Sequence, residues 1–124
     1  MERGSIVIVS AQGDYGKPRP AVVIQNGRMA DLVGSVTVCF MTSDLIPDGP
    51  MRVTVPPDPG NGLQLVSQIQ IEKIMTFPRA KVRGPIGLLM EQQLAAVERG
   101  LLFFLDLIRP IDISIVTALP RRTD

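Results

Sequence analysis

The sequence predicts a mainly β (α+β) fold, in which a small barrel or sandwich of short strands is followed by one amphipathic helix. Two observations support this fold class. Short runs rich in β-branched residues alternate with Gly, Pro and Asp turn signals over the first two thirds of the chain. After Gly87 the apolar residues change to helical spacing. The 124 residues, 45% of them hydrophobic, are enough for one domain with one core.

The expected strands are separated by the turn sequences GDYG, PDGP and PPDPGNG. They cover residues 5–9, 20–25, 35–42, 51–56 and 63–77. The last of them is expected to be one long or kinked strand. Its alternation places Ile69 and Ile71 on one side. The other side carries Gln68, Gln70 and Glu72.

The expected helix covers MEQQLAAVERGLLFFLDL, residues 90–107, and Pro110 ends it. Its apolar residues recur at helical spacing at Leu94, Val97, Leu101 and Leu105. Gly100 lies inside this pattern at a cost of about 1 kcal/mol relative to Ala, so we expect close packing against the core there. The chain therefore divides into a domain of residues 1–110 and a tail of residues 111–124. The tail alternates like a strand and ends polar and basic, which fits either an added strand or disorder.

The composition excludes several classes of active site. The chain contains no histidine, which rules out His-based acid–base pairs, Ser–His triads and His-ligated metals. The one cysteine, Cys39, lies inside VTVCF and is expected to be a buried strand residue. A formal net charge of +1 does not indicate a nucleic-acid partner. No apolar run is long enough to span a bilayer and the N-terminus lacks a signal-peptide pattern, so we expect a cytoplasmic protein.

Arg19 stands between two prolines at the start of the second expected strand. Lys17 and Arg19 each precede a proline, which favours extended or polyproline backbone geometry. Pro18 and Pro20 have no N–H group and therefore fit a strand entrance or edge. The sequence thus predicts a stiff mount for a permanently charged side chain, although an arginine in such a position is more often a surface ion-pair partner.

Several motifs, in this order, resemble the MazF/PemK family, the toxins of bacterial toxin–antitoxin pairs. They are GDYGKPRPAVVIQ, MTSD, NGL, SQIQIEKIMTFPRAKV and the terminal amphipathic helix, and they cover roughly residues 3–108. The resemblance implies an SH3-like small β-barrel with a C-terminal helix, assembled as a homodimer. It also implies sequence-selective cleavage of single-stranded RNA by 2′-OH transesterification, without metal or cofactor, and a cognate antitoxin that inhibits the toxin.

The resemblance further implies roles for individual residues. Arg19 and Thr42 match the family's catalytic pair, and Ser43 follows as a supporting hydroxyl donor. Such groups can orient RNA and stabilise charge on its phosphate, because RNA supplies its own nucleophile. The alternative is that Thr42 and Ser43 bond their own turn after the strand. Glu72 occupies a position with a catalytic base role in some members, and a solvated strand face is the other interpretation.

Further polar residues are candidate RNA contacts. Gln68 and Gln70 could contact base edges from one strand face. Tyr15, beside Asp14 at the tip of the first loop, could stack a base or could cap the barrel mouth instead. The expected RNA-binding residues are Asp14, Tyr15, Lys17, Gln68, Gln70, Lys73, Arg79, Lys81 and Arg83.

Three of these residues form a local basic pattern. Arg79, Lys81 and Arg83 alternate in RAKVR, so an extended backbone would place all three on one face as a basic stripe for RNA phosphates. The same pattern fits an edge strand that is protected by charge.

The antitoxin and a second copy of the chain are the expected protein partners. The antitoxin is expected to lay an acidic, partly disordered segment across the dimer and to compete with RNA for Arg19 and the basic stripe. The segment Leu88–Met90 is apolar where relatives carry polar residues before the last helix. This segment and the helix are therefore candidate dimer or antitoxin contacts.

Two other functions remain open for a barrel of this kind. A CcdB-type gyrase poison has the same barrel-plus-helix plan but depends on a tryptophan near its C-terminus, and this chain has no tryptophan. The second alternative is a non-catalytic barrel that binds RNA or protein, because catalysis depends on sub-ångström placement of Arg19 and Thr42.

Overall fold

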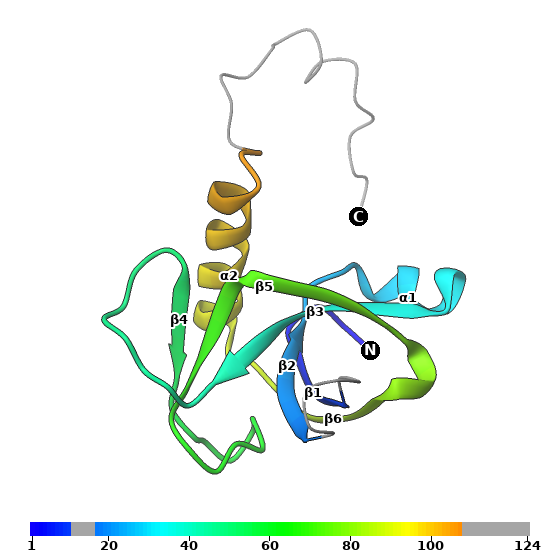
Figure 1. Cartoon of the computed structure of the whole chain (residues 1–124), viewed down its shortest axis with the longest axis horizontal. Helices are drawn as coiled ribbons and strands as arrows, with labels where there is room; N and C mark the ends of the chain where they lie inside the picture. The colour runs from blue at the N-terminus through cyan, green and yellow to red at the C-terminus, as the bar shows by residue number, and fades with distance from the viewer. Residues whose placement is uncertain (11–16, 108–124) are drawn as a thin grey trace, which may run out of the picture.

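The computed structural model of the chain describes residues 1–10 and 17–107. Six strands in these residues form one antiparallel sheet with the order β4-β5-β3-β2-β1-β6. The strands are β1 (Ser5–Ser10), β2 (Pro18–Val23), β3 (Ser35–Thr42), β4 (Arg52–Val55), β5 (Ser67–Pro78) and β6 (Val82–Leu88). The sheet curls into an open barrel, whose edge strands β4 and β6 are not paired with each other in the described residues (Figure 1). The expected mainly β fold with a C-terminal helix is confirmed.

The start of β2 lies at a partly open edge of the sheet. Pro18, Arg19 and Pro20 pair with β1, opposite Ser10, Val9 and Ile8. Pairing of β2 with β3 includes only residues 21–23. The two prolines therefore occupy the part of β2 that does not pair with β3, as expected for residues without an N–H group.

The long strand β5 bends sharply, as the sequence suggested. Its register against β3 jumps from Cys39↔Ile74 to Met41↔Ile69, so two steps along β3 correspond to five along β5. The first part of β5, residues 67–70, pairs with β4 as well as with the end of β3. Because of this bend, β5 pairs with β3 along its length and with the edge strand β4 at its start.

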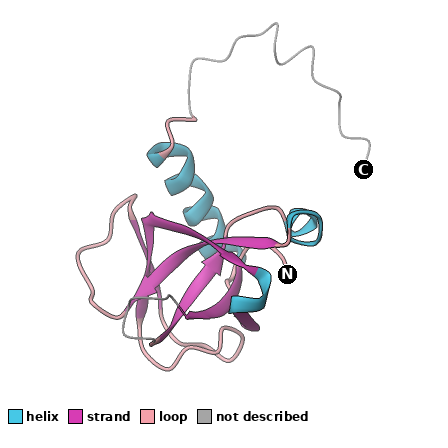
Figure 2. Ribbon diagram, turned by 45° about the vertical axis from the view of Figure 1, so that its right-hand side comes forward, coloured by secondary structure: helices cyan, strands magenta, loops and turns pink. Residues whose placement is uncertain are grey.

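The helix α2 (Glu91–Phe104) covers one end of the sheet and contacts β4 and β5 (Figure 2). Val97 is fully buried in a core cluster with residues of β1–β5, among them Ile6 and Ile71. A side chain at Gly100 would place its Cβ 2.6 Å from the Pro50 carbonyl oxygen, which confirms the expected close packing. In the described residues, no helix has the length and apolar character needed to cross a membrane.

The sequence reading missed a helix and a strand and assigned one segment wrongly. The helix α1 (Gly27–Val33) begins at Asn26, whose side chain accepts a bond from the Arg28 N–H, and ends at Gly34 in the left-handed region. The strand β6 is not among the five expected strands, although its first residues, Val82 and Arg83, belong to the RAKVR segment for which an edge strand was the alternative. In the segment RAKVR, Arg79–Lys81 forms a short 3-10 helix, so the extended basic stripe that alternation predicted is wrong. The Arg79 guanidinium instead donates to the Val82 carbonyl, which tightens this turn.

Cys39 is fully buried on β3, as expected, and its thiol donates to the Ile71 carbonyl. Burial, with a smaller effect of the Glu72 carboxylate, raises the pKa of Cys39 from 9.0 to about 12. The thiol therefore stays neutral in the folded protein at pH values where the unfolded chain already carries thiolate. The resulting stability contribution is present below pH 9 and is lost as the pH rises from 9 to 12.

We therefore expect Cys39→Ala to lose stability less steeply at alkaline pH than the wild type. Between pH 9 and 12 the free energy of unfolding of the wild type should fall more steeply than that of Cys39→Ala, by a difference that approaches about 1.4 kcal/mol per pH unit. Urea denaturation of both proteins at pH 8, 9.5 and 10.5 measures it, because all other titrating groups are shared. Parallel stability curves would show that the thiol is not desolvated.

Candidate active site

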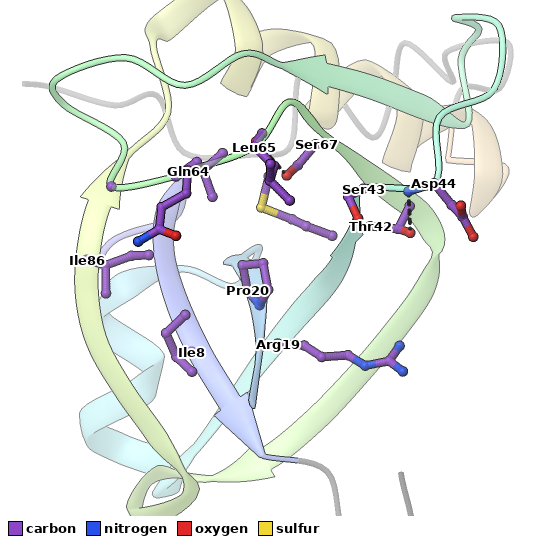
Figure 3. A pocket seen from close by; sticks show the side chains of 13 residues that line it. Ile8, Arg19, Pro20, Thr42, Ser43, Asp44, Gln64, Leu65, Ser67 and Ile86 are labelled. Carbon is purple, nitrogen blue, oxygen red and sulfur yellow. Dashed lines mark hydrogen bonds between the residues drawn. The ribbon is translucent and has the colours of Figure 1, made fainter. Parts of the chain in front are cut away.

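A pocket of about 600 Å³ opens on the barrel and is lined by residues of five strands, β1, β2, β3, β5 and β6, and of two loops. Its residues are Ile8, Arg19, Pro20, Met41, Thr42, Ser43, Asp44, Gly62, Leu63, Gln64, Leu65, Ser67 and Ile86. Figure 3 shows Arg19, Thr42 and Ser43 on one side and Gln64 with Ile86 on the other. The fold thus brings Arg19 and the Thr42–Ser43 pair to one cavity from different strands.

Arg19 reaches this pocket from the stiff start of β2. Its side chain is exposed, whereas the neighbouring Pro20 is half-buried and forms part of the lining. Because the prolines on both sides fix the backbone, binding of an anion by the guanidinium costs side-chain rotamer entropy but little backbone entropy. The planar guanidinium can donate two parallel N–H bonds to a phosphate.

Thr42 and Ser43 enter the pocket where β3 ends. The Thr42 hydroxyl accepts a 3.1 Å hydrogen bond from the Asp44 N–H (Figure 3). This is the local turn bond that the sequence analysis gave as the alternative to a catalytic role. The two roles are compatible, because the bond occupies a lone pair and leaves the O–H free to donate. The turn bond therefore fixes the hydroxyl of Thr42 in place.

The opposite wall comes from the loop between β4 and β5, which sequence reasoning treated as a turn. The fully buried Asn61 organises it. Its Oδ1 accepts from the N–H groups of Asp58 and Leu63 at 3.2 and 3.0 Å, and its Nδ2 donates to the Pro56 carbonyl at 2.8 Å. Gln64 extends from this loop into the pocket lining with an exposed side chain. The sequence PGNG marks a turn but does not show what the turn faces.

One expected RNA contact, Gln68, is contradicted by its burial. Its side chain is only 2% exposed and forms four hydrogen bonds inside the fold, so it cannot present its amide to a base edge. The period of two correctly placed Gln68 in a strand but did not show that Ile46 of the loop after β3 and the side chains of Arg52 and Thr54 lie against its amide. These neighbours depend on strand order, which sequence alternation does not encode.

The other expected residues do not line the pocket. Gln70 and Glu72 are half-buried on β5, and Lys73 is exposed beside them. Lys17 is exposed two residues before Arg19. The basic residues Arg79, Lys81 and Arg83 lie around the short 3-10 helix, on exposed surface outside the pocket. Asp14 and Tyr15, like the tail of residues 111–124, fall outside the described residues.

No metal site is formed by the described part of the chain. Within residues 1–10 and 17–107, no three His, Cys, Asp or Glu side chains gather where they could hold a metal ion. The polar side chains of the pocket are the Arg19 guanidinium, the hydroxyls of Thr42, Ser43 and Ser67, the Asp44 carboxylate and the Gln64 amide. The guanidinium and the hydroxyls can donate hydrogen bonds to a phosphate. The amide can both donate to and accept from a polar ring, such as a nucleobase, bound beside that phosphate.

Comparison with known proteins identifies the family. The family model of PemK-like, MazF-like toxins of type II toxin–antitoxin systems matches residues 2–105. The chain belongs to this family. A curated relative, the probable endoribonuclease MazF of Mycolicibacterium smegmatis, is 43% identical over 108 residues, which are 85% of this chain and 96% of that protein.

Solved structures of MazF proteins share the fold. The Mycobacterium tuberculosis toxin MazF-mt6 superimposes with a TM-score of 0.69 at 24% identity, over 82% of this chain and 96% of that one. An endoribonuclease in complex with its cognate antitoxin from a mycobacterial species gives a TM-score of 0.73 at 17% identity, over 89% and 99%. The MazE–MazF complex of Deinococcus radiodurans gives 0.67 at 20% identity, over 87% and 98%. The barrel and terminal helix of this chain therefore have the same fold as these proteins.

Proposed function

We propose that this MazF-family toxin is a sequence-selective endoribonuclease that cuts single-stranded RNA through the RNA's own 2′-OH, without a metal ion. The observation that carries this proposal is the convergence of Arg19, Thr42 and Ser43 on one open pocket. The match to the toxin family and the 43% identity to a probable endoribonuclease support the same activity.

In this reaction the 2′-oxygen bonds to the adjacent phosphorus while the bond from phosphorus to the 5′-oxygen breaks. The 2′-OH gives its proton to solvent water and the leaving 5′-oxygen takes one from solvent water, so the products are a 2′,3′-cyclic phosphate and a 5′-OH. In the transition state, while one bond to phosphorus forms and the other breaks, negative charge builds on the non-bridging oxygens of the phosphate. Arg19 donates two N–H groups to those oxygens, and the hydroxyls of Thr42 and Ser43 donate to the same phosphate. Glu72 lies outside the pocket lining, and we assign it no step.

Base selection belongs, in this proposal, to the wall opposite Arg19. The amide of Gln64 both donates and accepts hydrogen bonds, so it can distinguish base edges that differ in donor and acceptor order. The apolar side chains of Leu65 and Ile86 beside it provide surface for the face of a base. The distance along the RNA between the phosphate and the selected base is then set by the width of the pocket.

The proposed partners are a second copy of the chain and an inhibitory antitoxin, in the cytoplasm where transcripts are translated. Two of the similar solved structures are complexes of a toxin with its antitoxin. Exposed apolar side chains gather at the C-terminal end of α2: Leu102, Phe103, Phe104, Leu105 and Leu107. Leu88 and Met90, which precede the helix at its other end, are also exposed. A monomer rarely exposes so many large apolar groups together, which supports an interface there.

Cleavage of a long, weakly structured RNA in excess EDTA tests the proposed function. We expect discrete cuts whose upstream ends carry cyclic phosphate and whose downstream ends carry 5′-OH, as determined by end-specific ligation. Binding of RNA by folded protein without any cut would instead favour the non-catalytic barrel. Cuts that disappear in EDTA and return with added magnesium would contradict the metal-free chemistry.

A further inference from the structure

The buried Gln68 holds the loop that carries Thr42, Ser43 and Asp44. Gln68 lies in the middle of three strands, opposite Thr42 on β3 and opposite Thr54 on β4. Its Oε1 accepts from the Ile46 N–H at 3.1 Å, and its Nε2 donates to the Ile46 carbonyl at 2.7 Å. A side-chain amide that binds both backbone groups of one residue mimics a strand pair. The loop is therefore fixed to β5 at Ile46.

Two neighbours of Gln68 extend this attachment. The Arg52 Nη1 donates to the Asp44 carbonyl at 3.1 Å and to the Gln68 Oε1 at 3.0 Å. Gln68 Nε2 also donates to the Thr54 hydroxyl at 3.1 Å, and that hydroxyl donates in turn to Asp48 Oδ1 at 2.5 Å. We call the three residues Arg52, Thr54 and Gln68 the loop clamp. It attaches the loop at three successive places.

The loop has little else to hold it. Leu45 and Ile46 are each 51% exposed, so the segment contributes little apolar burial of its own. Hydrogen bonds from a buried side chain are strong and directional when every donor and acceptor is paired, as they are at Gln68. A short polar loop held in this way keeps one geometry, whereas a loop without apolar anchors opens readily.

We infer that Gln68, with Arg52, is a positioning residue for the reaction: it fixes the Thr42–Asp44 turn relative to Arg19 and so sets the catalytic geometry without touching RNA. This inference depends on the proposed function. Displacement of a catalytic group by about 1 Å can reduce the rate about 100-fold. The clamp acts on the chemical step through Thr42 and leaves the other wall of the pocket unchanged.

The test compares Gln68→Met, which keeps the side-chain length but removes the four hydrogen bonds of the Gln68 amide, with Val36→Ala. Val36 is fully buried in the second core cluster at the far end of β3, so Val36→Ala destabilises the protein without changing the clamp. Both variants are measured at a temperature where each is folded. For Gln68→Met we expect kcat on a cleavable oligonucleotide to fall 10- to 100-fold with KM within about threefold of wild type. Val36→Ala should retain wild-type kcat.

A double-mutant cycle shows whether Gln68 acts through Thr42. Adding Thr42→Ala to Gln68→Met should reduce kcat further by much less than Thr42→Ala does alone. Strictly multiplicative effects, or a wild-type kcat in Gln68→Met, would overturn the inference while the proposed function stands.

Amide hydrogen exchange of Ile46 supplies a readout that does not need activity. Its N–H should exchange at least tenfold faster in Gln68→Met than in wild type, and at an unchanged rate in Val36→Ala. An Ile46 amide that exchanges equally fast in all three proteins would refute the clamp. If the wild type cuts no RNA, the proposed function fails, and with it the role in catalysis; the exchange result then still decides whether Gln68 holds the loop.

Discussion

Replacing Arg19 by alanine should reduce RNA cleavage by a factor of about 100 to 1,000 and leave the fold intact. The guanidinium is the one cation among the described residues that line the pocket, and it meets the phosphate where charge develops. Loss of one preorganised donor of this kind raises a barrier by about 2.7–4 kcal/mol. Because the Arg19 side chain is exposed, its removal leaves no buried cavity. Initial rates on a fluorescent single-stranded oligonucleotide measure the effect.

Two further variants make this result specific. Arg19→Lys keeps the charge but loses the bidentate geometry, so its rate should lie between those of wild type and Arg19→Ala. Arg28→Ala removes an equally exposed arginine from α1, outside the pocket, and should cleave like the wild type. Equal loss of activity in Arg19→Ala and Arg28→Ala would mean that only overall charge matters, which would remove the basis for the site.

Replacing Gly87 by alanine should destabilise the protein by about 3 kcal/mol, the largest stability effect that we expect from a single added methyl group. A Cβ at this position of β6 would lie 2.5 Å from both the Cα and the carbonyl oxygen of Asn61. These are backbone atoms of the residue that organises the pocket loop, so they cannot rotate away. Either β6 or the loop must move, and movement of the loop would displace Gln64. Urea denaturation at neutral pH measures the change.

Gly49→Ala is the matched control. An added Cβ at Gly49 meets no atom within 4 Å, and the backbone there is not left-handed. Its stability should therefore stay within about 0.5 kcal/mol of wild type. Similar stability of the two glycine variants would show that β6 and the loop are not in contact at Gly87.

Local pattern predicted the strands because they are short β-branched runs between turn residues, and the last helix because its apolar residues recur at helical spacing. The five expected strands are all present, and Val97 and Gly100 of α2 meet the core as their spacing indicated. The helix α1 was missed because its seven residues are too few for a helical period, although Asn26 and Gly34 mark its ends. The prediction of an extended backbone for RAKVR was wrong because the chain turns at Arg79–Lys81, between β5 and β6.

The sequence predicted only those site residues that stand in a distinctive local motif. The arginine between prolines and the hydroxyl pair at the end of β3 could be found in this way, and the structure brings them to one pocket. Gln64 and the clamp around Gln68 could not, because their roles depend on which strands become neighbours. Alternation made Gln68 a candidate contact to RNA bases, whereas its amide is bonded to Ile46, Arg52 and Thr54 inside the fold.

The central claim is that this pocket cuts RNA with the RNA's own 2′-OH. Once a cut has been mapped, an oligonucleotide with a single 2′-deoxy substitution at the nucleotide 5′ to the cut tests it directly. We expect that substrate to bind with nearly unchanged affinity and to remain uncut in EDTA, while deoxy substitution one nucleotide further along leaves cleavage intact. Cleavage of the substituted bond at a comparable rate would mean that water or another group attacks the phosphorus, and the account of Arg19, Thr42 and Ser43 given above would be wrong.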